Sequence, residues 1–246
     1  MIDFDLSDEQ QLLEQSVRDW AAREVAPHIR ELDRQHRFDP AVLPQMAKLG
    51  LLGCSVPVEY GGAGMDYLSL GLISEELEYV DTSLRVIMSV HAGLNCLTLL
   101  TWGTEDQKQR YLVPQAQGSK LATYGLTEPG AGSDVRGIQT VAIKRGDRYF
   151  LTGEKMWISL ADIADNFLVF AWTDLEKKKQ RDTSGISAFI VERAFKGFSS
   201  GTLKEKWGIL AGNTGFFKME DVEVPEANLV GRQRRTRHSD RRGAER

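Results

Sequence analysis

The spacing of apolar residues changes near residue 120, and this change restricts the chain to folds in which helices come first and strands follow. Before that point, residues such as Leu13, Val17 and Trp20 recur every three or four positions, which is the period of an amphipathic helix. After it, short apolar runs at residues 167–173 and 186–191 are typical of β-strands. We therefore predict an α+β protein. Its parts are an all-α helical domain (1–120), an antiparallel β-barrel or sandwich domain (121–230) and a disordered, arginine-rich tail (231–246).

Capping residues predict where the helices begin and end. The predicted N-terminal caps are Ser7 with Gln10, Asp66, Asp81, and Thr104 with Gln107. Pro27 and Pro114 are expected to end the first and last of these helices, and a short helix over residues 40–49 is expected to stop at Gly50. Residues 84–100 are apolar but shorter than the roughly 20 residues of a bilayer span, so we expect a buried core helix and no membrane.

The second half of the chain contains the pattern of a β-hairpin and further strands. Residues 141–143 and 149–151 flank the turn Arg145-Gly146-Asp147. Further strands are predicted over residues 156–159, 167–173, 186–191 and 214–224. The lysine-rich residues 176–181 are expected to form a solvated loop.

Charge and cysteine content exclude several classes of function. The net charge is −4, and without residues 231–246, which hold seven arginines, the remaining 24 basic and 33 acidic residues give −9. An acidic body does not indicate a nucleic-acid partner. Cys54 and Cys96 lack metal or redox spacing, and the N-terminus has no targeting pattern, so we expect a cytoplasmic protein without a metal.

The segment most suggestive of chemistry is residues 124–137, YGLTEPGAGSDVRG. A glycine-rich loop allows a ligand to approach the backbone closely. It is not a dinucleotide fingerprint, because Val135 stands where the third small residue should follow Gly130 and Gly132, and no βαβ pattern surrounds it. Composition alone favours a turn-rich connection between strands.

The order of residues in this segment resembles the signature of the acyl-CoA dehydrogenase family. Three further segments resemble the family at residues 57–64, 153–174 and 222–231, so that the resemblance covers about residues 4–231. It implies the fold of that family and FAD as the cofactor. One departure is Leu160, which follows Trp157-Ile158-Ser159 where the family often has Asn, and which puts the local turn in question.

The resemblance also implies which residues hold FAD. They are Tyr124, Gly125, Leu126, Thr127, Glu128, Pro129, Gly130, Ala131, Gly132 and Ser133, followed by Trp157, Ile158 and Ser159. In this arrangement Thr127 and nearby amides hydrogen-bond the polar edge of the flavin, Trp157 packs on it, and Ser159 lies near N5. Ser133 also meets acyl-CoA. The two segments are expected to converge in one cleft between the domains, while His91 is interpreted as a satisfied core histidine.

The family oxidises saturated acyl-CoA thioesters to trans-2-enoyl-CoA, passing a hydride to the flavin and then electrons to an electron-transfer flavoprotein. The resemblance therefore implies fatty acid or amino acid catabolism by a homo-oligomer, a tetramer or dimer. The family's base is a glutamate of a third, C-terminal helical domain, and residues 232–246 cannot form one, since Ala244 is their only aliphatic residue. We expect no catalytic residue here, impaired activity, and an exposed apolar patch. A flavin oxidase or monooxygenase of this fold, or a non-catalytic ligand-binding remnant, remains an alternative.

Overall fold

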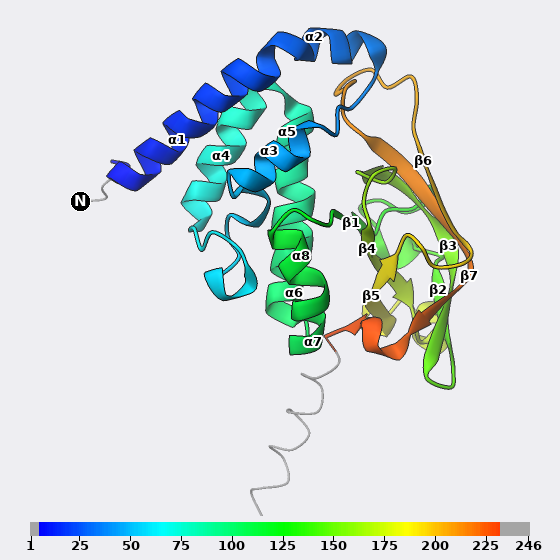
Figure 1. The fold of residues 1–246 in the computed structure, drawn as a ribbon. Coiled ribbons are helices and arrows are strands. Elements are labelled where there is room, and N and C mark those ends of the chain that lie inside the picture. The colour runs from blue at the N-terminus through cyan, green and yellow to red at the C-terminus, as the bar shows by residue number, and fades with distance from the viewer. Residues whose placement is uncertain (1–4, 232–246) are drawn as a thin grey trace, which may run out of the picture.

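A layer of helices lies beside a layer of strands (Figure 1). The structure is a computed structural model in which residues 5–231 are described, so the arginine-rich segment 232–246 lies outside the described residues. The last helix of the helical layer, α8, ends at Ala116 and the first strand begins at Ala122, near the predicted change of character. The α+β prediction is confirmed.

The helices begin where the capping residues predict. They are α1 (Asp8–Trp20), α2 (Ala26–Gln35), α3 (Val42–Lys48), α4 (Tyr67–Val80), α5 (Thr82–Ile87), α6 (Leu97–Trp102), α7 (Glu105–Gln107) and α8 (Val113–Ala116). Ser7 and Thr104 form complete capping boxes, and Asp66 and Asp81 accept hydrogen bonds from the first turns of α4 and α5. Gly50 follows α3 in the left-handed conformation (φ 74°).

Pro27 does not end its helix, contrary to the prediction, whereas the last helix of the layer ends close to Pro114, at Ala116, as predicted. A π-helical turn, η1 (Ala21–Val25), joins α1 to α2, and another, η5 (Lys108–Leu112), joins α7 to α8. Each proline is therefore the second residue of a new α-helical segment. A proline is tolerated in a first turn, because its missing N–H and its ring then disturb no established helical hydrogen bond.

One long apolar helix runs through the helical layer. It comprises α5, the π-helical segment η4 (Met88–Cys96) and α6, a span of 21 residues whose most apolar 18-residue window has a mean hydropathy of 1.4. It is thus longer than the predicted 17-residue run, and by length and composition alone it could cross a membrane. Core helices of soluble proteins pass the same test, and here 44% of its most apolar window is buried inside the structure.

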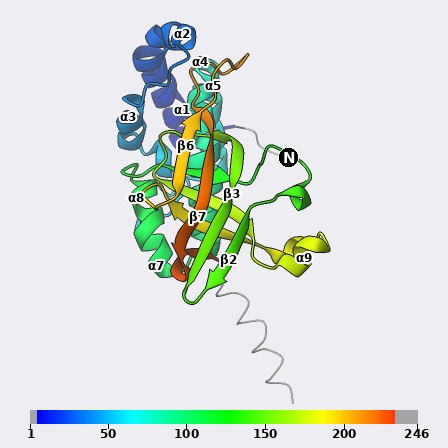
Figure 2. The same cartoon turned by 90° about the vertical axis from the view of Figure 1, so that its right-hand side faces the viewer.

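The strands form one hydrogen-bonded sheet in the order β6-β7-β3-β2-β4-β5-β8, with β1 paired to β4. They are β1 (Ala122–Gly125), β2 (Val141–Arg145), β3 (Arg148–Ser159), β4 (Asn166–Trp172), β5 (Ile186–Glu192), β6 (Phe198–Thr202), β7 (Thr214–Pro225) and β8 (Leu229–Val230). The predicted hairpin is β2–β3. Figures 1 and 2 show β2, β3, β6 and β7 on the side away from the helices.

Three details of the β region differ from the prediction. The sheet is mixed, although largely antiparallel, because β4 pairs in parallel with both β1 and β2. The segment predicted as a strand over residues 156–159 is the end of the longer β3. The lysine-rich stretch contains a short helix, α9 (Leu175–Lys179), because Asp174 accepts hydrogen bonds from the N–H groups of Glu176 and Lys177.

The helical and strand layers share one hydrophobic core. Val17 and Leu77 of the helices belong to the same buried cluster as Phe167 and Phe217 of the strands. Because protein interiors are close-packed, this shared core fixes the orientation of the two layers. It therefore also fixes the connection from β1 into the glycine-rich segment that the sequence singles out.

Candidate functional site

The glycine loop, residues 126–133, leaves the end of β1 and runs alongside β3. The carbonyl of Thr127 accepts a hydrogen bond from the N–H of Met156 (3.0 Å), which joins the loop to the strand that carries Trp157. Glu128 and Ala131 exchange two backbone hydrogen bonds of 3.0 and 3.1 Å, and these close the loop into a tight turn. The structure therefore brings the two predicted segments together.

Trp157 is turned out of β3 by a bulge. Met156 pairs with Phe216 and Ile158 with Gly215, so Trp157 is an extra residue without a partner across the ladder. Its backbone is in the left-handed conformation (φ 61°), and its side chain is 62% exposed. This conformation costs roughly 1–2 kcal/mol for a non-glycine residue. Such strain is typical of sites where a side chain is held for a purpose other than packing.

A second left-handed residue, Leu160, ends the same strand. Its φ is 62°, its side chain is buried, and its N–H donates to the carbonyl of Asn213 (2.7 Å). This is the position at which the sequence departs from the pattern it resembles. Asn adopts the left-handed conformation more readily than Leu. The turn is nevertheless formed here, because packing of the Leu160 side chain offsets the backbone strain.

The hydroxyl-bearing side chains of the predicted site have no partner among residues 5–231. The hydroxyl groups of Thr127, Ser133 and Ser159 make no hydrogen bond there, and none of the three residues is buried. The indole N–H of Trp157 likewise donates to no described residue. A bound ligand could therefore form hydrogen bonds with these hydroxyl groups and with the indole N–H.

Two glycines of the loop have no reason in the fold itself to be glycine. A Cβ built on Gly130 or Gly132 meets no atom within 4 Å, and neither residue has a positive φ. Gly125 differs, because a Cβ there would lie 2.4 Å from the ring of Phe217. Both residues are exposed, and the open space over Gly130 and Gly132, called the cradle below, would be occupied by a side chain at either position. The absence of side chains there fits close approach by a ligand.

Glu128 does not present its side chain to this cradle, so we revise its predicted role. Its carboxylate is 5% exposed and accepts hydrogen bonds from the N–H groups of Gln139 and Thr140, from the Thr140 hydroxyl and from the Lys155 ammonium. Burial by itself would raise the pKa of Glu128, but the Lys155 charge and these hydrogen bonds lower it below its ordinary value. Glu128 therefore anchors the loop as a carboxylate.

Several other predicted residues can contribute only backbone atoms or packing. Ile158 is 2% exposed and belongs to the hydrophobic core, and the carbonyl of Leu126 accepts from Lys155 Nζ (3.1 Å). Tyr124 packs on Phe170 with ring centroids 5.0 Å apart. Lys155 itself was missed by the sequence analysis. The sequence did contain a signal for this role. Lys155 lies on the same face of β3 as Tyr149 and Leu151, which point inward, and a charged residue is unusual on such a face.

Two surface grooves lie near the loop, where one cleft between the helical and strand domains was predicted. Neither groove is lined by a residue of the helical layer. A groove of about 530 Å³ is lined by Trp157, Thr214 and residues 203–209. A second, of about 440 Å³, is lined by Val135, by Phe170 of β4 and by residues of β5 and β8. The glycine loop lies between Met156, next to the first groove, and Val135, in the second. This arrangement suits an extended ligand more than a compact one.

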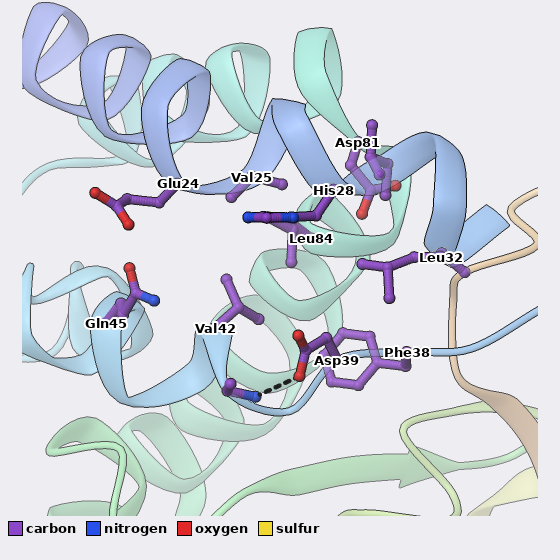
Figure 3. A pocket seen from close by; sticks show the side chains of 13 residues that line it. Glu24, Val25, His28, Leu32, Phe38, Asp39, Val42, Gln45, Asp81 and Leu84 are labelled. Atoms are coloured by element: carbon purple, nitrogen blue, oxygen red, sulfur yellow. Dashed lines mark hydrogen bonds between the residues drawn. The ribbon is translucent and has the colours of Figure 1, made fainter. Parts of the chain in front are cut away.

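Another pocket, of about 190 Å³, lies in the helical layer (Figure 3). Its lining includes Val25, His28, Val42 and Leu84, but none of the predicted site residues. Within residues 5–231, no group of three or more His, Cys, Asp or Glu side chains is placed to hold a metal ion.

Comparison with known proteins gives matches to both halves of the chain. The family described as "Acyl-CoA dehydrogenase, N-terminal domain" matches residues 7–119, and the family described as "Acyl-CoA dehydrogenase, middle domain" matches residues 123–222. The short-chain specific acyl-CoA dehydrogenase of Clostridium acetobutylicum is 44% identical over 232 residues, which are 94% of this chain and 60% of that protein.

Solved structures give the same result. Butyryl-CoA dehydrogenase from Megasphaera elsdenii aligns with a TM-score of 0.89 and 37% identity, over 94% of this chain and 60% of that chain. An acyl-CoA dehydrogenase from Bacillus anthracis, complexed with FAD, aligns with a TM-score of 0.84 and 38% identity, over 94% of this chain and 38% of that chain. The chain thus spans less than two thirds of the length of each of these relatives.

Proposed function

Because the chain belongs to the acyl-CoA dehydrogenase family, we propose that its described residues form the flavin- and acyl-CoA-binding part of a FAD-dependent acyl-CoA dehydrogenase. The observation that carries this proposal is the glycine loop with its open cradle at Gly130 and Gly132. The loop lies beside an outward-turned Trp157 and among hydroxyl groups that no described residue engages. These features fit a flat aromatic ring joined to a polar chain, which is the shape and chemistry of FAD.

Each group has a distinct task in this proposal. The Thr127 hydroxyl would donate a hydrogen bond to the polar edge of the ring, where a positioned donor stabilises developing negative charge. Trp157 would cover the ring and exclude water, and Ser159 would offer it a further hydroxyl. Ser133 would serve the polar chain and the acyl-CoA. When bound, FAD supplies the oxidising power that removes two hydrogens from the acyl chain.

We assign no general base among residues 5–231. Glu128 is the carboxylate within the loop, but it is buried and its oxygens already accept hydrogen bonds. A base must lie within hydrogen-bond reach of the proton that it removes. The proposed reaction is α,β-dehydrogenation of a saturated acyl-CoA, with an electron-transfer flavoprotein as the acceptor of electrons.

The proposal also covers the domain division, the oligomeric state and the location of the protein. We infer two domains that divide near residue 120, a homo-oligomer and a cytoplasmic location. The 21-residue helix made of α5, η4 and α6 is proposed as a core helix, because His91 and Cys96 in its middle are buried against α8 and β1.

Titration of the purified chain with FAD tests this function. We expect saturable binding of one FAD per chain, seen as quenching of tryptophan fluorescence because Trp157 lies against the ring. NAD is the control, since it shares the dinucleotide but lacks the flavin. Absence of saturable FAD binding, or equal binding of NAD, would contradict the proposal.

Substitution of Gly132 by alanine is expected to weaken FAD binding about tenfold, or about 1.4 kcal/mol, because a methyl group would occupy the cradle. The stability of the chain should change by less than about 0.5 kcal/mol, since nothing in the protein meets the new side chain. Gly71→Ala is the matched control. Gly71 is an exposed residue of α4 with similar open space, so its replacement should stabilise the helix by about 1 kcal/mol and leave FAD binding unchanged. Equal binding by all three proteins would refute the cradle.

A further inference from the structure

A buried ion pair lies at the base of the glycine loop. The Lys155 ammonium donates to Glu128 Oε1 (2.8 Å) and to the carbonyl of Leu126 (3.1 Å), and its side chain is fully buried. The other hydrogen bonds of the Glu128 carboxylate come from Gln139 and Thr140. One cluster therefore joins three segments that are far apart in the sequence: the loop, β3 and the residues before β2.

Stability alone is a weak explanation for this pair. Removing two charges from water costs several kcal/mol per ion, and apolar residues of similar volume often stabilise a core as well or better. What a saturated ion pair adds is direction, because each hydrogen bond restricts both distance and angle. The cluster thus fixes the backbone at residues 126–128 and at Lys155 relative to each other.

The residues next to this pair are the ones proposed to contact the flavin. Thr127 lies between Leu126 and Glu128, both of which are held by Lys155, and Trp157 follows Lys155 by two residues. The hydrogen bond from the Met156 N–H to the Thr127 carbonyl joins the two sides (3.0 Å). Any shift of the pair would therefore be transmitted to both Thr127 and Trp157.

We infer that Lys155 and Glu128 are positioning residues that set the Thr127 hydroxyl and the Trp157 ring in register for the flavin. This inference rests on the proposed function and assigns the pair no chemical step. Neither side chain reaches the cradle, since both are buried and engaged with the protein. Their effect on the flavin is exerted through the backbone of the loop and of the bulge.

The test compares the parent chain with the double variant Glu128→Gln/Lys155→Met. This variant removes both charges. The glutamine oxygen can take the place of Glu128 Oε1 and accept from the Thr140 N–H, while the Gln139 N–H loses its acceptor, Oε2. The measurements are the denaturant midpoint, the dissociation constant for FAD and the visible absorption spectrum of bound FAD. The control is Lys144→Met/Glu226→Gln, which removes a partly exposed pair at the opposite end of the β2–β3 hairpin.

We expect the double variant to remain folded with a lower denaturant midpoint, because the Gln139 N–H and the Leu126 carbonyl lose their partners. We also expect it to bind FAD at least tenfold more weakly and to show a shifted flavin spectrum. The control pair should leave all three measurements unchanged. If the double variant binds FAD with the parent's affinity and spectrum, the pair is only structural and the inference is wrong. If the parent itself binds no FAD, the proposed function fails, and the inference fails with it.

If the double variant does not fold, the single variant Glu128→Gln still tests the inference. Glu128→Gln alone keeps Lys155 in place and keeps an acceptor for Lys155 and for the Thr140 N–H, so it is the milder change. Only the Gln139 N–H loses its acceptor. The inference predicts a shifted flavin spectrum and weaker FAD binding in this variant too. A spectrum and dissociation constant equal to the parent's in folded Glu128→Gln would overturn it.

Discussion

Replacing Lys155 alone by methionine is expected to destabilise the folded chain by about 3–5 kcal/mol. The substitution leaves the Glu128 carboxylate buried without a counter-charge, and the breaking of a buried pair by removal of one partner typically costs this amount. The carbonyl of Leu126 also loses its donor. Because small proteins are stable by only about 5–15 kcal/mol, this loss would be a large fraction of the free energy of unfolding.

Equilibrium unfolding in urea, followed by circular dichroism, measures this loss. The matched control is Lys144→Met, which breaks a partly exposed ion pair with Glu226 and should cost less than about 1 kcal/mol. The added change Glu128→Gln should recover much of the stability lost in Lys155→Met, because it removes the unpaired charge. A loss below 1 kcal/mol for Lys155→Met would show that the pair is exposed to water in solution.

Local features of the fold could be predicted from the sequence because their causes are local. A cap such as Asp66 and the residue whose N–H it binds, Ser69, are three positions apart, so the pattern is visible in a short window. The turn around Gly146 likewise lies between the two strands that it joins. Such signals do not depend on the rest of the chain.

Features that depend on distant segments could not be predicted in this way. The parallel pairing of β1 with β4 joins Ala122 to Asn166, and nothing in the four residues of β1 specifies that partner. The first helix continues past Pro27 because a π-helical turn precedes the proline, and the periodicity of apolar residues does not reveal such a turn.

The same difference between local and long-range causes applies to the candidate site. The order of residues located the glycine loop and Trp157, but not the bulge that turns Trp157 outward, because a bulge is a property of the pairing between β3 and β7. The roles of Glu128 and Lys155 were also hidden. The hydrogen bond between the two side chains joins residues 27 positions apart, and only the folded structure shows that Glu128 points inward.

His91 carries the second large expected effect, a loss of stability in mild acid. The interpretation of His91 as a satisfied core histidine is confirmed: it is fully buried, its Nδ1 accepts from the Ala122 N–H (3.0 Å), and its Nε2 lies 3.1 Å from the Gln115 carbonyl. The neutral ring protonated on Nε2 satisfies both contacts. Burial accordingly lowers the pKa of His91 from 6.5 to about 4.

The direction in which pH changes the stability follows from which state of the chain, folded or unfolded, binds the proton on His91. Between pH 6.5 and about 4 the unfolded chain holds a proton on His91 and the folded chain does not, so acid favours unfolding throughout this window. The stabilisation is complete above pH 6.5 and decreases as the pH falls towards 4. A shift of this size corresponds to about 3 kcal/mol. Nearby, Cys96 stays neutral because burial raises its pKa, and the Asp165 carboxylate opposes the shift only weakly.

Unfolding free energies measured in urea from pH 7.5 to 4 would test this for the parent and for His91→Gln. Glutamine can accept from the Ala122 N–H and donate to the Gln115 carbonyl without titrating, so it preserves both contacts of the neutral ring. Carboxylates with lowered pKa values, such as Asp66 and Glu105, contribute equally to both proteins. The difference between the two curves should therefore change by about 3 kcal/mol across the window. A constant difference would mean that the ring is protonated in the folded chain, and that the link between α8 and β1 opens in acid instead of resisting protonation.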